Sequence, residues 1–204
     1  MIRREPARQF LSAKSELRRT SRVARHAAPR GFAPSLFTHH AARRSWLHGD
    51  GRGFRSRRHR IHSSGDYKNP PPEGEHAGLK RYHEERANGE AIEIPPGLRG
   101  ELGRAIVEKI LAGGHRVLVL AVTPKHLHVL VELPWNLAGA KRIVGTWKTA
   151  RTPAVRAELP GSIWGEGGSY KPVKTDGHRR NAFKYIRDDQ GPGAWVWVNE
   201  DAAP

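Results

Sequence analysis

Two apolar runs joined by a three-residue turn constrain the fold of this 204-residue chain more than any other feature. Residues 117–122 read Val-Leu-Val-Leu-Ala-Val, Thr123-Pro124-Lys125 follows, and the second run extends from His126 to Leu133. Short apolar runs bounded by turn residues are typical of strands, and a short turn places two strands side by side. The sequence therefore predicts a β-hairpin.

The second strand of this hairpin opens with His126-Leu127-His128. Because side chains alternate along a strand, His126 and His128 project from the same face and can converge on one divalent ion. Imidazole is a common metal ligand, but two imidazoles need a third protein group to complete a site. The alternative is that both are half-exposed strand histidines that bind nothing.

The remaining patterns add helices and strands on both sides of the hairpin. Apolar residues at helical spacing predict three helices, and alternating or apolar segments near the C-terminus predict two more strands. The helices are expected after Pro95 up to Gly113, at about 136–150 and at roughly 177–190. The strands are expected at 170–174 and 194–198. Residues 79–84 and 91–94 are weak candidates for a first strand. This order predicts an α+β domain, a ferredoxin-like antiparallel sheet with helices packed on one face.

The first 75 residues differ in composition from the rest. They contain 17 Lys and Arg against 6 Asp and Glu, and no sustained apolar periodicity. Such a segment buries too little surface to offset its ordering entropy, so residues 1–75 are predicted to be a disordered basic region and the domain to span 76–204. The Pro-rich stretch at 69–74 marks the boundary. A transit peptide or an overextended start are alternative explanations.

Overall composition narrows the class of protein. The absence of cysteine excludes disulfides, thiolate nucleophiles and cysteine-based zinc sites, and no apolar run is long enough to cross a membrane, so a cytoplasmic location is expected. A formal net charge of +16 predicts a polyanionic partner, although charge alone does not separate DNA from RNA, ribosome or anionic membrane.

The third predicted helix carries a further pair of chemically useful groups. Tyr185 and Asp189 are four residues apart and share a helix face, which places a phenol beside a carboxylate. The alternative hypothesis is that Tyr185 is a packing residue without a chemical role. The second predicted helix has a basic flank formed by Lys141, Lys148 and Arg151. This flank is either a solvated helix face or a surface that contacts phosphates.

Three spaced segments together resemble the single-tyrosine HUH transposases, particularly the REP-associated tyrosine transposases and their insertion-sequence relatives. The resemblance covers roughly residues 79–199. The segments that carry it are 121–131 (AVTPKHLHVLV), 163–170 with Val173, and 183–186 (FKYI).

The resemblance implies an enzyme that cuts and rejoins single-stranded or hairpin DNA. Tyr185 would attack the scissile phosphorus to give a 5′-phosphotyrosine, and His126 and His128 would hold Mg²⁺ or Mn²⁺. Family members carry a third ligand four residues after the tyrosine. Asp189 occupies that position and is preferred, with Gln190 as the alternative. DNA contacts are expected from Lys125, Lys141, Lys148, Arg151, Lys184 and Arg187.

Some alternatives remain at this stage. A domesticated or decayed copy would be a non-catalytic protein that binds nucleic-acid hairpins, and a ribosome-associated basic protein would suit the Arg-rich region equally well. Relatives include homodimers, which pair the histidines of one subunit with the tyrosine of the other, and monomers. Catalysis requires the two imidazoles and the phenol to meet at one phosphate.

Overall fold

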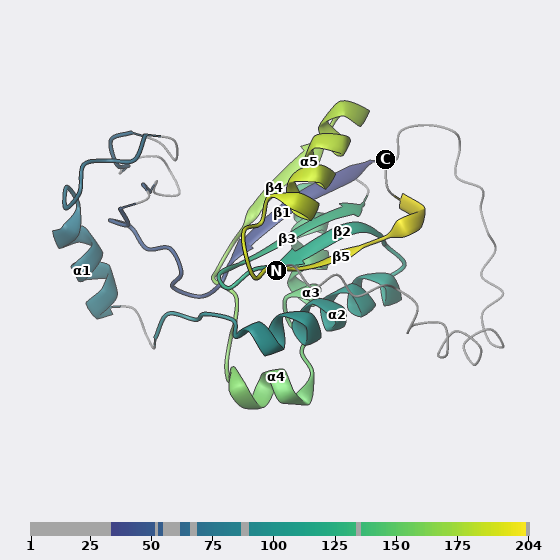
Figure 1. Cartoon of the computed structure of the whole chain (residues 1–204), viewed down its shortest axis with the longest axis horizontal. Helices are drawn as coiled ribbons and strands as arrows, with labels where there is room; N and C mark the ends of the chain where they lie inside the picture. The colour runs from purple at the N-terminus through teal and green to yellow at the C-terminus, as the bar shows by residue number, and fades with distance from the viewer. Residues whose placement is uncertain are drawn as a thin grey trace.

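The computed structural model describes residues 34–51, 53–54, 62–65, 69–86, 90–133 and 136–202 (Figure 1). They form one antiparallel sheet with helices on both sides. In chain order the elements are β1 (Ser35–Ala41), α1 (Ala77–Arg86), α2 (Pro96–Ala112), β2 (Arg116–Val122), β3 (His126–Glu132), α3 (Leu137–Trp147), α4 (Pro153–Glu158), β4 (Ser169–Val173), α5 (Asp176–Asp188), β5 (Trp195–Val198) and a 3-10 turn, η3 (Glu200–Ala202).

The sheet confirms the predicted fold class. Its strand order is β4-β1-β3-β2-β5, and every neighbouring pair is antiparallel. The first four strands, with α2 between β1 and β2 and α3 between β3 and β4, have the ferredoxin-like arrangement, and β5 extends it at the β2 edge. The predicted hairpin is the pair β2 and β3 at the centre of the sheet.

The helices divide between the two faces of this sheet. Helices α2 and α3 pack on one face, as expected, over a core that includes Leu102, Val129 and Trp147. Helix α5 packs on the opposite face, where Phe183 and Ile186 meet buried residues of β2 and β3. Residues 117–122 are all buried, so this strand needs cover on both faces, and the expectation that all helices share one face is wrong for α5.

The first strand of the sheet is Ser35–Ala41, within the region predicted to be disordered. It lies between β3 and β4 and pairs with both, so the predicted boundary at residue 76 is not the boundary of the sheet. Residues 1–33 lie outside the described part. The two segments considered as the first strand are not strands of the sheet: residues 79–84 belong to helix α1, and residues 91–94 belong to no helix or strand.

Helix α1 follows β1 in the chain and lies away from the sheet (Figure 1). It buries none of its residues. Within the described part of the chain, no helix has the length and apolar character that a membrane crossing requires.

Candidate active site

Three histidines from two neighbouring strands gather on the α5 face of the sheet. His126 and His128 project with Leu130, as strand alternation predicted, and His39 of β1 lies directly opposite His128 in the β1–β3 register. The ring centroid of His39 is 4.9 Å from that of His126 and 4.6 Å from that of His128, while the centroids of His126 and His128 are 6.1 Å apart. The strand pairing thus supplies a third imidazole to the predicted pair.

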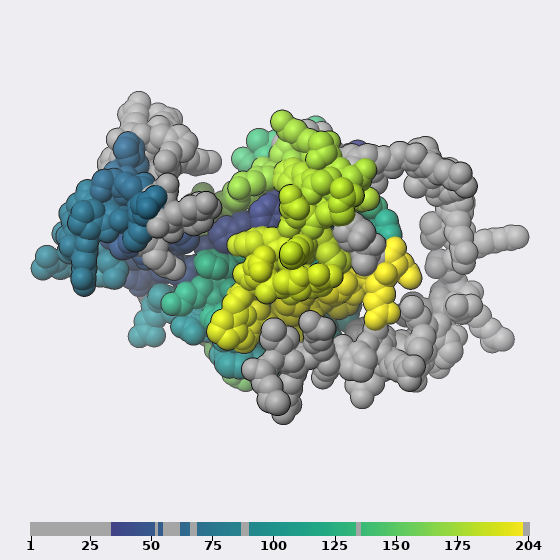
Figure 2. All heavy atoms as spheres, turned by 45° about the horizontal axis from the view of Figure 1, so that its top comes forward, coloured from purple at the N-terminus to yellow at the C-terminus, as the bar shows by residue number. Residues whose placement is uncertain are grey.

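Helix α5 places a phenol beside this cluster. Thr175 caps the helix, its hydroxyl accepting a hydrogen bond from the His178 backbone N–H, and the buried side of α5 anchors on the sheet through Phe183 and Ile186. Tyr185 points off that buried side and keeps 43% of its surface exposed. Its ring centroid lies 5.6 Å from that of His128. In Figure 2, α5 runs along the outside of the molecule.

Gln190 connects the tyrosine helix to His128. Its side-chain Nε2 donates to the backbone carbonyl of Tyr185 at 2.7 Å, and its Oε1 contacts Nδ1 of His128. A carbonyl oxygen only accepts, so the amide N–H faces Tyr185 and the amide oxygen faces the imidazole. Nδ1 of His128 therefore carries the proton, and Nε2 presents a lone pair, as a metal ligand requires.

Asp189, the preferred third ligand in the sequence, has a different environment from Gln190. Helix α5 ends at Asp188, and Asp189 is its C-cap residue, with a backbone N–H that donates to the Tyr185 carbonyl at 3.1 Å. The contact with His128 is made by Gln190. Among the described residues, no three histidine or acidic side chains converge in a metal-binding arrangement.

Burial keeps His39 and His128 neutral near pH 7. Desolvation lowers the pKa of His128 to about 4, although its contact with Gln190 acts in the opposite direction. Desolvation, together with the charges of His128 and His126, lowers the pKa of His39 to about 3. Neutral imidazoles are the form that binds metal, so the donor set fits a divalent cation held by two imidazoles, with water and a substrate oxygen completing it.

Two of the cations predicted to bind DNA lie on the same helix as Tyr185. Lys184 and Arg187 are exposed on α5, and Lys125 is exposed in the turn before β3. Arg187 is paired with Asp188, its Nε and Nη2 donating to the carboxylate at 2.9 and 2.7 Å. Lys171, not singled out in the sequence, pairs opposite Phe37, and its charge contributes to the low pKa of His39.

The other three predicted DNA contacts lie on or beside α3, which packs on the far face of the sheet. Lys141 is exposed there. Lys148 donates from Nζ to the carbonyls of Gly165 and Gly167 at 2.8 and 3.1 Å, and burial lowers its pKa. Arg151 donates to the carbonyls of Leu159 and Gly161. Lys148 and Arg151 thus hold the loop that precedes β4, and neither is free to track phosphates.

Comparison with solved structures gives a weak similarity. The structure of a REP-associated tyrosine transposase bound to a REP hairpin aligns with a TM-score of 0.37 and 14% sequence identity, over 80% of this chain and 72% of that one. No family model matches the chain. No curated protein matches its sequence. The argument for function therefore rests on the site itself.

His39 is the site residue that sequence reasoning missed. It lies in the Arg-rich region, whose average composition obscured a seven-residue strand. The signal was local, because residues 35–38 read Ser-Leu-Phe-Thr, a pattern typical of strands. Alternation along β1 sends His40 to the face opposite His39, where it is 1% exposed and contacts the carbonyl of Gly167 through Nδ1 at 3.2 Å.

His40 gives a pH-dependent contribution to stability. Burial, reinforced by the charge of Lys148, lowers its pKa to about 4, below the ordinary value of 6.5. The unfolded chain therefore binds this proton first, so the contribution is complete above pH 6.5 and declines as the pH falls towards 4. We expect His40→Gln to flatten the pH dependence of unfolding free energy by up to about 1.4 kcal/mol per pH unit in this range.

Guanidinium unfolding at pH 7, 6 and 5 measures this slope. Equal slopes for His40→Gln and the parent protein would show that His40 takes up its proton as readily in the folded state as in the unfolded state.

Proposed function

We propose that this chain is a metal-dependent single-stranded DNA transposase that cuts and rejoins DNA through a 5′-phosphotyrosine. The observation that carries the proposal is the position of Tyr185, exposed on an outer face with its ring 5.6 Å from His128. The motif resemblance implies the same roles for these residues. The reaction is consistent with the cytoplasmic location expected from the sequence.

In the proposed reaction, the phenolic oxygen of Tyr185 forms a bond to phosphorus while the bond from phosphorus to the 3′-oxygen breaks. The phenolic proton passes to solvent, and the leaving 3′-oxygen takes up a proton to become a hydroxyl. The phosphotyrosine conserves one phosphodiester-like bond, so a second 3′-hydroxyl can reverse the step and join a new strand. The reaction needs no nucleotide cofactor.

A bound Mg²⁺ or Mn²⁺ would act as a Lewis acid on the scissile phosphate. His126 and His128 are the residues that would hold it, and Gln190 fixes the His128 tautomer that leaves Nε2 available. Both imidazoles and the phenol come from one chain, so the proposed site is complete in a monomer. A homodimer that exchanges the tyrosine helix is not needed to assemble it.

The proposal is tested with labelled single-stranded and hairpin oligonucleotides in the presence of Mn²⁺. We expect a covalent protein–DNA adduct that forms with Mn²⁺ and is absent with a chelator, together with a released fragment ending in a 3′-hydroxyl. Salt-sensitive binding without any adduct would instead favour a non-catalytic nucleic-acid-binding protein. Although His39 lies beside the pair, no three histidine or acidic side chains of the described residues are arranged to hold a metal ion, and this observation favours that second candidate.

Gln190 and Asp189 are expected to contribute differently to Mn²⁺ binding. Because Gln190 orients His128, we expect Gln190→Ala to weaken Mn²⁺ binding about tenfold, whereas Asp189→Ala leaves it within about twofold. Isothermal titration of Mn²⁺ into each variant measures the difference. A larger loss in Asp189→Ala would return the third-ligand role to the carboxylate preferred from the sequence.

A further inference from the structure

Arg99, in the first turn of α2, is a buried cation that the proposed reaction does not use. It is 6% exposed, and no carboxylate of the described residues forms an ion pair with it. A buried charge without a counterion is costly, and an apolar side chain of similar length would pack more cheaply at this position. The specific contacts of its guanidinium therefore need an explanation.

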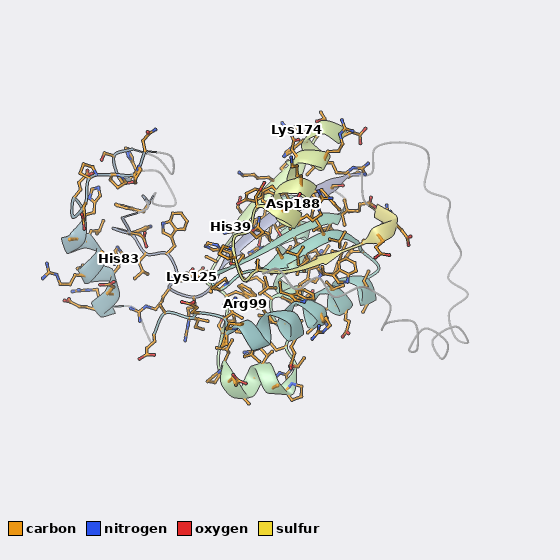
Figure 3. The ribbon with its side chains drawn as sticks, viewed as in Figure 1. His39, His83, Arg99, Lys125, Lys174 and Asp188 are labelled. Atoms are coloured by element: carbon orange, nitrogen blue, oxygen red, sulfur yellow. The ribbon has the colours of Figure 1, made fainter. Side chains whose placement is uncertain are left out.

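The guanidinium holds two backbone carbonyls that are 99 residues apart in the chain. Nε donates to the carbonyl of Ile94 at 2.9 Å, and Nη1 donates to the carbonyl of Gly193 at 2.6 Å. We call these two hydrogen bonds the Arg99 bridge. Figure 3 shows Arg99 at the same end of the sheet as His39 and Lys125.

One end of the Arg99 bridge leads to His126. Ile94 is fully buried, and its backbone N–H donates to the carbonyl of Pro124 at 2.7 Å. Pro124 lies in the turn before β3, where the Thr123 hydroxyl accepts a hydrogen bond from the His126 N–H at 2.9 Å. These hydrogen bonds link the position of Ile94 to that of His126, the first of the two proposed metal ligands.

The other end leads to Gln190 and the tyrosine helix. Gly193 is three residues beyond Gln190, which contacts both His128 and the Tyr185 carbonyl. Gly193 has a φ of +81°, and a Cβ added there would lie 3.0 Å from Nη1 of Arg99. The loop after α5 therefore passes close to the guanidinium, with no side chain between them.

We propose that Arg99 is a positioning residue for the reaction, which fixes the loop carrying Gln190 relative to the turn that starts the histidine strand. This inference rests on the proposed function. The planar guanidinium donates along two fixed directions at once, whereas a lysine ammonium at the same position is a single point charge. Arg99→Lys therefore keeps the charge but loses the Arg99 bridge.

The first test measures geometry and does not depend on activity. The chain has no cysteine, so Lys125→Cys and Pro192→Cys place two spin labels on the two segments that Arg99 joins. We expect the distance distribution between the labels to broaden in Arg99→Lys and in Gly193→Ala. It should stay narrow in Lys109→Gln, an exposed charge on α2, and in Gly114→Ala, a glycine with φ of +76° and nothing within 4 Å of an added Cβ.

The second test measures the reaction. We expect Arg99→Lys and Gly193→Ala to lower the rate of adduct formation at saturating DNA about tenfold or more, with DNA affinity and melting temperature close to those of their controls. Gly193→Ala keeps the buried charge in place, so it tests the bridge even if Arg99→Lys folds poorly.

The outcomes separate the two proposals. The positioning role is overturned if the distance distribution is unchanged in both bridge variants. It is also overturned if the distribution broadens while the rate of adduct formation stays unchanged. If the parent protein forms no adduct at all, the proposed function fails, whereas the distance measurement still decides whether Arg99 fixes the loop.

Discussion

Tyr185→Phe should abolish adduct formation with single-stranded or hairpin DNA, lowering the rate at least about a thousandfold. The substitution removes only the hydroxyl, which supplies the attacking oxygen. The ring keeps its contacts with Phe37 and His128, so the sheet and the histidine cluster should be undisturbed. Gel separation of protein–DNA adducts in Mn²⁺ measures the loss.

Tyr82→Phe is the matched control for this experiment. Tyr82 is 48% exposed on α1, close to the 43% of Tyr185, and α1 stands apart from the sheet. The Tyr82→Phe variant should form the protein–DNA adduct at the rate of the parent protein. Both variants should bind DNA with an affinity within about twofold of the parent protein. An adduct that persists in Tyr185→Phe would assign the nucleophile to another side chain.

A chain that lacks residues 1–75 should not fold, although the sequence alone predicted that it would. This deletion removes β1, leaving β3 and β4 without the strand that lies between them. It also removes Leu36, which is 1% exposed in the core. Typical domains are stable by about 5–15 kcal/mol, less than the loss of a central strand is expected to cost.

Circular dichroism and thermal unfolding measure this effect. A chain that begins at Pro34 keeps every described element and should show the cooperative transition of the full-length protein. Leu36→Ala in the full-length chain should lower stability by about 2–5 kcal/mol. A folded product from the 76–204 fragment would show that β1 is dispensable.

Several elements could be predicted because each has its own periodic pattern. They are the hairpin, the helices at 96–112, 137–147 and 176–188, and the strand at the C-terminus. Helix α4 could not, because it has only 6 residues, and strand β1 was missed because it lies within a region of Arg-rich composition. The place of β1 is set by pairing with β3, more than 80 residues away, and no local pattern records that partner.

The same reasoning explains how much of the site the sequence revealed. Strand alternation correctly placed His126 and His128 on one face. The sequence left open whether Tyr185 packs in the core, and the structure leaves it 43% exposed. Helical spacing failed for Asp189, because α5 ends at Asp188 and the chain no longer follows the helix beyond it. That change of direction carries Gln190 to His128.

Mass spectrometry of the proteolysed protein–DNA adduct tests the central claim most directly, because it identifies the residue that holds the 5′-phosphate. The account predicts a nucleotide remnant on the peptide that contains Tyr185, formed only when Mn²⁺ or Mg²⁺ is present. A remnant on any other residue, or DNA that is bound and never attached, would contradict it.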